Sequence, residues 1–199
     1  MPKLSLTDLV DVVSKSGTPK STKVTQIKHR PPYSPATDFY KPLRDEIIHI
    51  HASALAKATL TKFGSSVSDP KKAANYPDAI TGYTSWWGRK SITWFIPPSE
   101  TYSANGVDVS VNPELGLEFG GQHYIIKLYF KADPLAKSRV NLITHMMEIS
   151  LRPKCTHSEI MALLYVRNSK LFAPAVPIAG LTPVVNAELA YIAALWPLV

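Results

Sequence analysis

Glu114 and Lys127 are the two residues of this sequence whose types and spacing best suit chemistry. From 107 to 119 apolar residues alternate with polar ones, which predicts a strand. Gly120-Gly121 is typical of a two-residue hairpin turn, and the return strand covers 122–132. With both glycines in the turn, opposed residue numbers sum to 241, so Glu114 faces Lys127. Opposed side chains lie about 5 Å apart. The two side chains would therefore meet on one face of the sheet, where a plain cross-strand ion pair on the surface is the favoured interpretation.

Other common catalytic motifs are absent from the sequence. It has no phosphate-binding glycine loop with Lys and Ser/Thr, no dinucleotide fingerprint and no His-Glu-x-x-His. It also lacks the Gly-x-Ser-x-Gly elbow of acyl-transfer enzymes. Cys155 is the single cysteine, which excludes an internal disulfide and a cysteine-based zinc site. A thiolate–imidazole pair of Cys155 with His157 is disfavoured because residues so close in sequence seldom orient usefully.

Hydrophobic periodicity and turn residues predict the elements that position this pair. Leu43, Ile47 and Ile50 recur at helical spacing, and Glu46 lies on the flank of their stripe. The predicted elements are a helix over 41–63, loops over 65–89, a strand over 91–96, the hairpin, a helix over 137–151, a strand over 160–166 and a final helix opening at Thr182-Pro183.

These elements predict an α/β (or α+β) fold. Three layers are expected, with a mixed central sheet flanked by helices and the element order αβββαβα. The continuous apolar run over 160–166 is typical of a central strand covered on both faces. Residues 41–199 are predicted to form a single domain of this class, preceded by a basic N-terminal arm over 1–40 with a short helix that Thr7 caps.

The element order resembles the restriction-endonuclease-like superfamily, named for its PD-(D/E)xK motif. Pro113-Glu114 on one strand and Ile125-Ile126-Lys127 on the next carry the resemblance. It implies a metal-dependent nuclease, in which two acids hold a divalent metal, usually magnesium, and the lysine helps to activate the attacking water. The implied catalytic residues are Glu114, Lys127 and, as an extra acid on the preceding helix, Glu46; Glu114 and Glu46 would bind Mg²⁺.

The sequence departs from the motif at Ile125, two positions before the lysine, where the second acid belongs. Glu118 cannot replace it beside Glu114, because four residues along a strand span about 13 Å. The departure predicts a nucleic-acid-associated member that is catalytically degenerate or atypical, acting on DNA or RNA.

The net charge of +7 indicates where nucleic acid would bind. Between Val12 and Thr37 all charged residues are basic, and glycine and prolines predict an extended arm that could follow a phosphate backbone. An alternative is a solvated arm wrapped over its own domain. Tyr83, Trp86, Trp87 and Arg89 form an aromatic-basic cluster that could stack on bases or pack a loop onto the core. The predicted nucleic-acid-binding residues are Lys15, Lys20, Lys23, Lys28, Arg30, Trp87, Arg89 and Lys131.

Composition narrows the class of protein. With 45% hydrophobic and 19% charged residues the chain is unlike disordered proteins. No run approaches 18 consecutive apolar residues and no signal-like stretch opens the chain, so we expect a cytoplasmic protein without a membrane span. The final helix is apolar enough for a homodimer interface, but its residues suit closing the domain's own core slightly better; they are Val184, Val185, Leu189, Ile192, Leu195 and Trp196. A non-enzymatic interaction or structural protein is therefore the alternative function.

Overall fold

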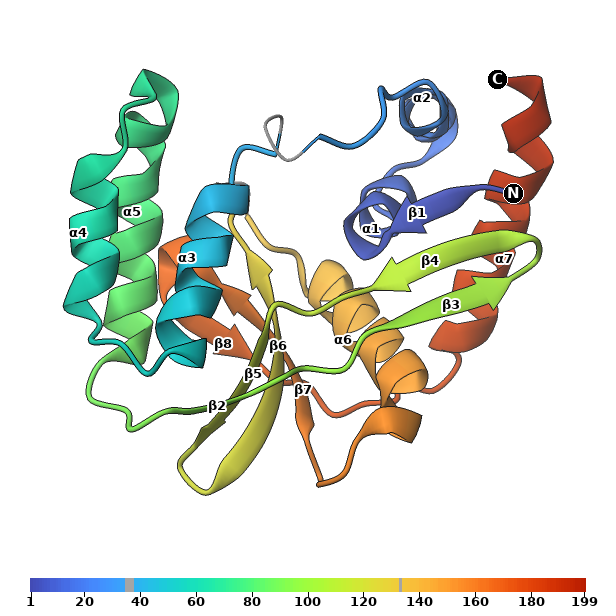
Figure 1. Cartoon of the computed structure of the whole chain (residues 1–199). Helices are drawn as coiled ribbons and strands as arrows, with labels where there is room; N and C mark the ends of the chain where they lie inside the picture. Colours follow the sequence, from blue (N-terminus) through green and yellow to red (C-terminus); the bar gives the residue numbers. More distant parts are fainter. Residues whose placement is uncertain (35–37, 133) are drawn as a thin grey trace.

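The computed structural model describes residues 1–34, 38–132 and 134–199. A five-stranded sheet with the order β2-β5-β6-β7-β8 lies at the centre (Figure 1). β6 and β7 are parallel, and the other neighbours are antiparallel. The strands are β2 (Thr93–Phe95), β5 (Leu115–Phe119), β6 (Gln122–Tyr129), β7 (Ile160–Tyr165) and β8 (Lys170–Phe172).

A second, three-stranded sheet has the order β1-β4-β3. It contains β1 (Lys3–Ser5), β3 (Glu100–Ala104) and β4 (Val107–Val111), with β1 parallel to β4. The helices are α1 (Leu6–Val13), α2 (Gly17–Lys28), α3 (Lys41–Ala52), α4 (Ala58–Ser66), α5 (Pro70–Trp87), α6 (Lys137–Leu151) and α7 (Leu181–Leu195), with short 3₁₀ turns η1 (Arg152–Lys154), η2 (Val166–Asn168) and η3 (Trp196–Leu198).

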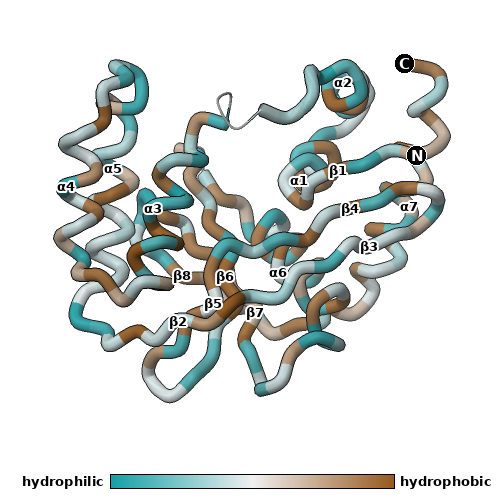
Figure 2. Tube along the Cα trace, in the orientation of Figure 1, coloured by the Kyte–Doolittle hydropathy of each residue, from teal (hydrophilic) through white to brown (hydrophobic). Residues whose placement is uncertain are grey.

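The mixed sheet flanked by helices confirms the α/β (or α+β) class. Successive residues of β6 face two different cores: Ile125 packs with residues of α1 and α6, and Ile126 packs with residues of α3 and α5. Figure 2 shows apolar stretches where the strands cross the centre of the molecule. The observed order contains more elements than αβββαβα, including β1, β3, β8 and separate helices before the sheet.

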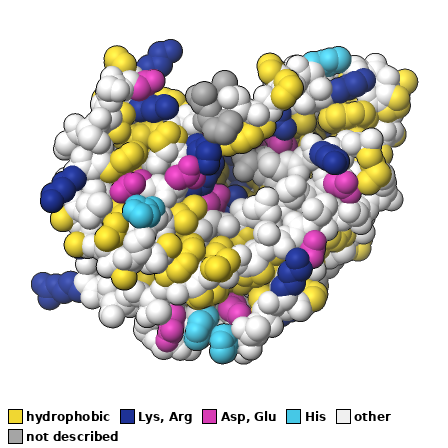
Figure 3. Space-filling model, in the orientation of Figure 1, with side chains coloured by type: hydrophobic (Ala, Val, Ile, Leu, Met, Phe, Trp, Pro, Cys, Tyr) yellow, Lys and Arg dark blue, Asp and Glu magenta, His cyan; other side chains and the backbone are white. Residues whose placement is uncertain are grey.

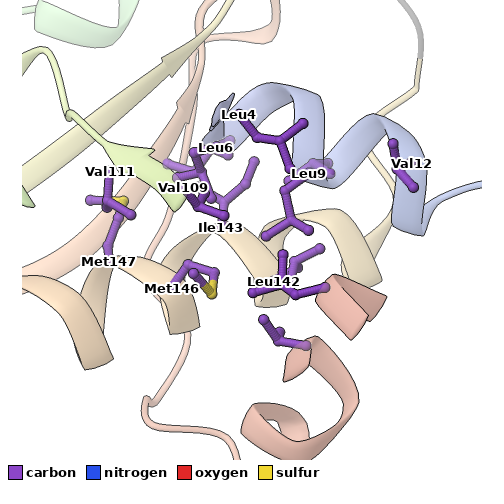
Figure 4. Packing of buried hydrophobic residues seen from close by; sticks show 14 of the residues in the cluster. Leu4, Leu6, Leu9, Val12, Val109, Val111, Leu142, Ile143, Met146 and Met147 are labelled. Atoms are coloured by element: carbon purple, nitrogen blue, oxygen red, sulfur yellow. The ribbon is translucent and has the colours of Figure 1, made fainter. Parts of the chain in front are cut away.

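The first core joins the N-terminal segment to the rest of the chain. Figure 4 shows Leu4, Leu6 and Leu9 beside Ile143 of α6 and Val109 of β4. All five side chains are at most 5% exposed. Burying a Leu or Ile side chain stabilises a fold by about 1.5–3 kcal/mol. β1 and α1 are therefore an integral part of the packing.

The hairpin register is confirmed. Leu115 pairs with Ile126, Leu117 with Tyr124 and Glu118 with His123. The prediction of one alternating strand over 107–119 is wrong, because it divides into β4 and β5, which belong to different sheets. Pro113, between them, has no N–H for a ladder hydrogen bond, so the strand is interrupted there.

The prediction of an extended arm is wrong for Gly17–Lys28, which form α2. Pro19 lies in the first turn, where its missing N–H costs no helical hydrogen bond. Val24 and Ile27 are buried in the first core, which holds the helix in place. Residues 35–37 of the predicted arm lie outside the described residues. The cap of α1 is Ser5 rather than Thr7: Ser5 Oγ accepts from Asp8 N, and Ser5 N donates to Asp8 Oδ2.

Two predictions for the segment before the central sheet, one of a helix and one of a loop, are also wrong. The expected helix over 41–63 is divided into α3 and α4, and Ala54 between them has a left-handed φ of 50°. The expected loop over 65–89 is mostly α5. Asp69 caps this helix by accepting from Lys72 N at 3.0 Å, and Pro77 lies inside it. Buried residues at helical spacing hold α5 on the second core: Tyr76, Ala79, Ile80, Tyr83 and Trp86.

The second half of the chain follows the prediction. α6 has the predicted bounds, and β7 lies centrally between β6 and β8 with its last five residues buried. The sequence predicts Thr182 as the cap and Pro183 as the first residue of the final helix, but α7 begins two residues earlier, at Leu181, with Gly180 at its cap position. Thr182 does not act as the predicted cap; its hydroxyl lies 2.9 Å from His145 Nε2.

Candidate functional site

Glu114 and Lys127 meet as the hairpin register requires. Glu114 Oε1 lies 2.5 Å from Lys127 Nζ, and the two side chains are 10% and 17% exposed. Glu114 Oε2 accepts a hydrogen bond of 2.8 Å from Leu128 N, and Lys127 Nζ donates to the Asn112 carbonyl at 2.8 Å. Both carboxylate oxygens are therefore occupied by this protein's own donors.

A second cation, Arg44 of α3, interacts with this pair. Its guanidinium donates to Asp38 Oδ2 at 2.7 Å. Burial disfavours the charge of Arg44, but the hydrogen bond and charge of Asp38, followed by the charges of Glu114 and Asp45, outweigh burial and raise the pKa of Arg44. Glu114 thus lies in the field of two cations, Lys127 and Arg44. Arg44 was not among the predicted site residues. The only feature of the sequence that could have indicated it was its position, one helical turn after Lys41 at the start of α3.

Glu46 is not brought to this pair. On a helix, residues two apart point about 160° from one another. Arg44 and Glu46 lie on opposite flanks of the buried stripe of α3, and the charge of Arg44 is the one that interacts with Glu114. Within the described part of the chain Glu46 makes no ion pair or hydrogen bond with Glu114 or Lys127.

The residues present do not fit a divalent metal. Ile125, at the position of the second acid, is fully buried in the first core. Glu114 would have to exchange Lys127 and Leu128 N for the ion. Among the described residues no group of three His, Cys, Asp or Glu side chains could hold a metal.

α1 covers the neighbourhood of Lys127. A cavity of about 20 Å³, room for about one water molecule, lies between α1 and the end of β6, and its lining includes Thr7, Asp11, Lys127 and Lys131. Lys131 donates to both Asp11 oxygens, at 2.9 and 3.1 Å, and Lys23 lies 3.3 Å from Asp11 Oδ2. Burial opposes ionisation of Asp11, but Lys131 and Lys23 outweigh it and lower its pKa. Two of the predicted nucleic-acid-binding residues, Lys23 and Lys131, therefore share one carboxylate.

The other predicted arm cations are mostly paired as well. Lys20 forms an ion pair with Glu188 of α7. Lys28 donates to the carbonyls of Trp196 and Val199 near the end of the chain. Arg30 binds Asp8 with two hydrogen bonds of 3.0 Å. Lys15 is exposed and has no ion pair in the described residues. These contacts favour the alternative of an arm folded over its own domain.

The aromatic-basic cluster packs largely inward. Trp87 stacks on His51 with ring centroids 4.3 Å apart and 30° between the planes. His51 Nε2 lies 2.6 Å from the Tyr83 hydroxyl, and both residues are buried. Arg89 is exposed beside them. This arrangement is that of a packed structural cluster, in which Trp87 has one ring face covered.

The α4–α5 lobe (residues 53–92) carries basic residues that the sequence reasoning did not group together. Its two acids are engaged: Asp69 caps α5, and Asp78 lies 3.1 Å from Arg167. The lobe has six cations and two acids, so its net charge is +4. The basic excess of this segment could have been found by counting the charged residues of 53–92 in the sequence. Its cations are Lys57, Lys62, Lys71, Lys72, Arg89 and Lys90.

Charged side chains also border a hollow on the face drawn in Figure 3. The hollow lies between the lobe of α3–α5 and the lobe of α1, α2 and α7. Lys, Arg, Asp and Glu side chains gather along its walls. Its mixed charge contrasts with the basic excess of the α4–α5 lobe.

Cys155 does not provide a reactive thiolate. Its Sγ donates to the Leu151 carbonyl at 3.3 Å. Burial, assisted by the charge of Glu159, raises the pKa of the thiol to about 11. Since the thiolate is the nucleophile, this shift disfavours reaction of Cys155 at neutral pH.

Comparison of the sequence with protein-family models and with curated proteins finds no match.

Proposed function

We propose that this chain is a nucleic-acid-associated, nuclease-like domain in which the cleavage site is degenerate. The observation that carries the proposal is the ion pair between Glu114, the residue before β5, and Lys127 of the neighbouring strand β6. The order of elements around the central sheet supports it. Antiparallel β2, β5 and β6 are followed by α6 and by β7, which is parallel to β6.

The degenerate character rests on three features of the pair. Ile125 supplies no carboxylate, and Glu46 lies on the far flank of α3 from Glu114. Lys127 and Leu128 N occupy both oxygens of Glu114. Arg44 adds a positive charge, which repels a metal cation. The pair therefore serves to join β5 to β6, and we expect no magnesium-dependent cleavage.

The basic α4–α5 lobe is the surface on which we place nucleic acid. Lys62, Lys71 and Lys72 have no ion pair in the described residues, whereas the arm cations Lys20 and Lys23 do. A cation without a protein partner can neutralise a phosphate without first breaking an ion pair, and each such contact releases counterions. This binding would be independent of base sequence.

A salt titration tests the proposal. Fluorescence anisotropy with labelled single- and double-stranded DNA and RNA would run from about 50 to 300 mM salt, where phosphate contacts weaken steeply. Lys71→Glu/Lys72→Glu should weaken binding at least tenfold and lower the salt slope by about two. Lys3→Glu/Lys15→Glu makes the same charge change on the N-terminal segment and should have a smaller effect. Absence of binding to every probe at the lowest salt refutes the proposal.

A separate assay tests degeneracy. The protein would be incubated with DNA and RNA in the presence of Mg²⁺ or Mn²⁺, and no cleavage is expected. Cleavage that is lost in both Glu114→Ala and Lys127→Ala would show that the pair is an active centre. Cleavage that survives both substitutions would show that the chemistry lies elsewhere.

A further inference from the structure

The outward face of α7 is apolar along its whole length. Val185, Leu189 and Ile192 are buried against the body of the protein. On the opposite side Val184 is 51%, Tyr191 37% and Leu198 80% exposed. The exposed residues of α7 and η3 together are Pro183, Val184, Ala187, Ala190, Tyr191, Ala194, Pro197 and Leu198. None of them is charged, although an outward helix face is normally polar.

The spacing of the exposed residues defines a straight seam. Val184, Ala187, Tyr191, Ala194 and Leu198 are separated by three, four, three and four residues. This is the 3.5-residue repeat with which one helix packs along another. The ion pair of Lys20 with Glu188 lies at the margin, and Lys20 Nζ stands 4.9 Å from the Tyr191 ring centroid. The Lys20 ammonium therefore covers one face of the Tyr191 ring, while the seam residues themselves are all uncharged.

Two kinds of occupant could cover an apolar helix face, a lipid surface or another helix. Within the described residues, Leu181–Leu198 is long and apolar enough to cross a membrane by length and composition, and 17% of that stretch is buried. Ala187 and Ala194 lie in the seam and Ala190 lies beside it, however, and alanine gains little from insertion into lipid. Small side chains instead let two helix backbones approach closely. The side chains thus favour a helix as the partner.

We infer that this seam is a homodimer interface, in which α7 of one copy packs against α7 of a second copy. A self-complementary seam needs no other protein, because one apolar strip without charges matches itself. From Val184 to Leu198 the strip is about 21 Å long, at 1.5 Å per residue. Pairing it with its own copy buries on the order of 1,000 Å² in total at most, which is the size of weak, transient interfaces. We therefore expect a weak dimer.

Sedimentation velocity of the full chain from about 1 to 200 µM tests the inference, since this range brackets a micromolar dissociation constant. The wild type should change from monomer to dimer as its concentration rises. Ala194→Arg places a charge at the seam and should raise the dissociation constant at least 100-fold. Ala74→Arg makes the same change on the exposed face of α5 and should leave dimerisation unchanged. Circular dichroism of each variant verifies that it is folded.

Flotation with neutral and with anionic vesicles separates the two occupants. The inference requires that the wild type dimerises and stays with the soluble fraction. A wild type that remains monomeric at 200 µM would overturn it, and so would a dimer that persists in Ala194→Arg. Monomeric protein that floats with vesicles would show that lipid covers the seam instead. Ala194→Arg lies on α7, outside the α4–α5 lobe, and only the control Ala74→Arg lies within the lobe. Failure of the dimer inference would therefore leave the nucleic-acid proposal unaffected.

Discussion

Breaking the Glu114–Lys127 pair should destabilise the fold by an amount that depends on which partner is removed. Glu114→Gln removes the negative charge and leaves one acceptor oxygen, so either Lys127 or Leu128 N loses its partner, while the Lys127 ammonium keeps the Asn112 carbonyl, 2.8 Å away, and remains four-fifths buried. A hydrogen bond to a charged group contributes about 1.5–3 kcal/mol. We therefore expect Glu114→Gln to lower the free energy of unfolding by about 2–3 kcal/mol.

Lys127→Met should cost less, about 1–2 kcal/mol. Glu114 then keeps its 2.8 Å bond from Leu128 N and the nearby charge of Arg44. The double variant removes both charges, so its loss should fall short of the sum of the two single losses by about 1–2 kcal/mol, the coupling energy of the pair.

Urea unfolding at 25 °C, followed by circular dichroism, measures this cycle with and without 5 mM Mg²⁺. Single losses below about 0.5 kcal/mol that add without coupling would mean that the pair is an ordinary solvent-screened surface contact. A wild type that Mg²⁺ stabilises, while Glu114→Gln is unaffected, would refute the conclusion that the site does not fit a metal.

Three further predictions concern buried groups. Ile125→Asp restores the second acid of the motif. It should destabilise the fold by about 3 kcal/mol or more, because it buries an unpaired carboxylate in a fully enclosed position. A soluble variant with wild-type stability in urea would contradict this prediction. Burial lowers the pKa of His51 from 6.5 to about 4, so below pH 6.5 the unfolded chain binds a proton that the folded chain does not, and stability should fall by up to about 3 kcal/mol by pH 4. His51→Gln, which can still accept from the Tyr83 hydroxyl, should flatten that dependence in urea melts recorded between pH 4 and 7. Gly82→Ala should lower the melting temperature by about 6–12 °C, since the added Cβ would lie 2.1 Å from the Val166 carbonyl oxygen and force α5 away from η2. An unchanged melting temperature would show that this contact relaxes freely.

Features set by neighbouring residues could be predicted from the sequence. The hairpin register followed from period-two alternation and two turn glycines, and the structure has the same pairs. α6 was predicted with its correct bounds because its apolar residues recur at helical spacing over four turns. α5 was missed although Tyr76, Ala79, Tyr83 and Trp86 share that spacing, because Asp69-Pro70 and Pro77 are turn residues elsewhere. In α5 the aspartate caps the helix instead.

The candidate site divides in the same way. The sequence placed Glu114 opposite Lys127, but it could not show that Arg44, and not Glu46, would face them. That choice depends on how α3 is rotated against the sheet, which Leu43 and Ile47 determine by packing on the second core. The arm cations could not be recognised as paired either, since their partners Asp8, Asp11 and Glu188 lie on other helices.

The sequence by itself therefore determined the hairpin, the facing acid and base, and the absence of a second carboxylate at Ile125, because strand alternation and a tight turn act over a few residues. Only the tertiary structure decided which charges remain unpaired. Ion pairing and burial join residues that are distant in the chain, as Lys20 and Glu188 are. The same long-range packing left Lys62, Lys71 and Lys72 without ion pairs among the described residues and exposed the apolar outer face of α7.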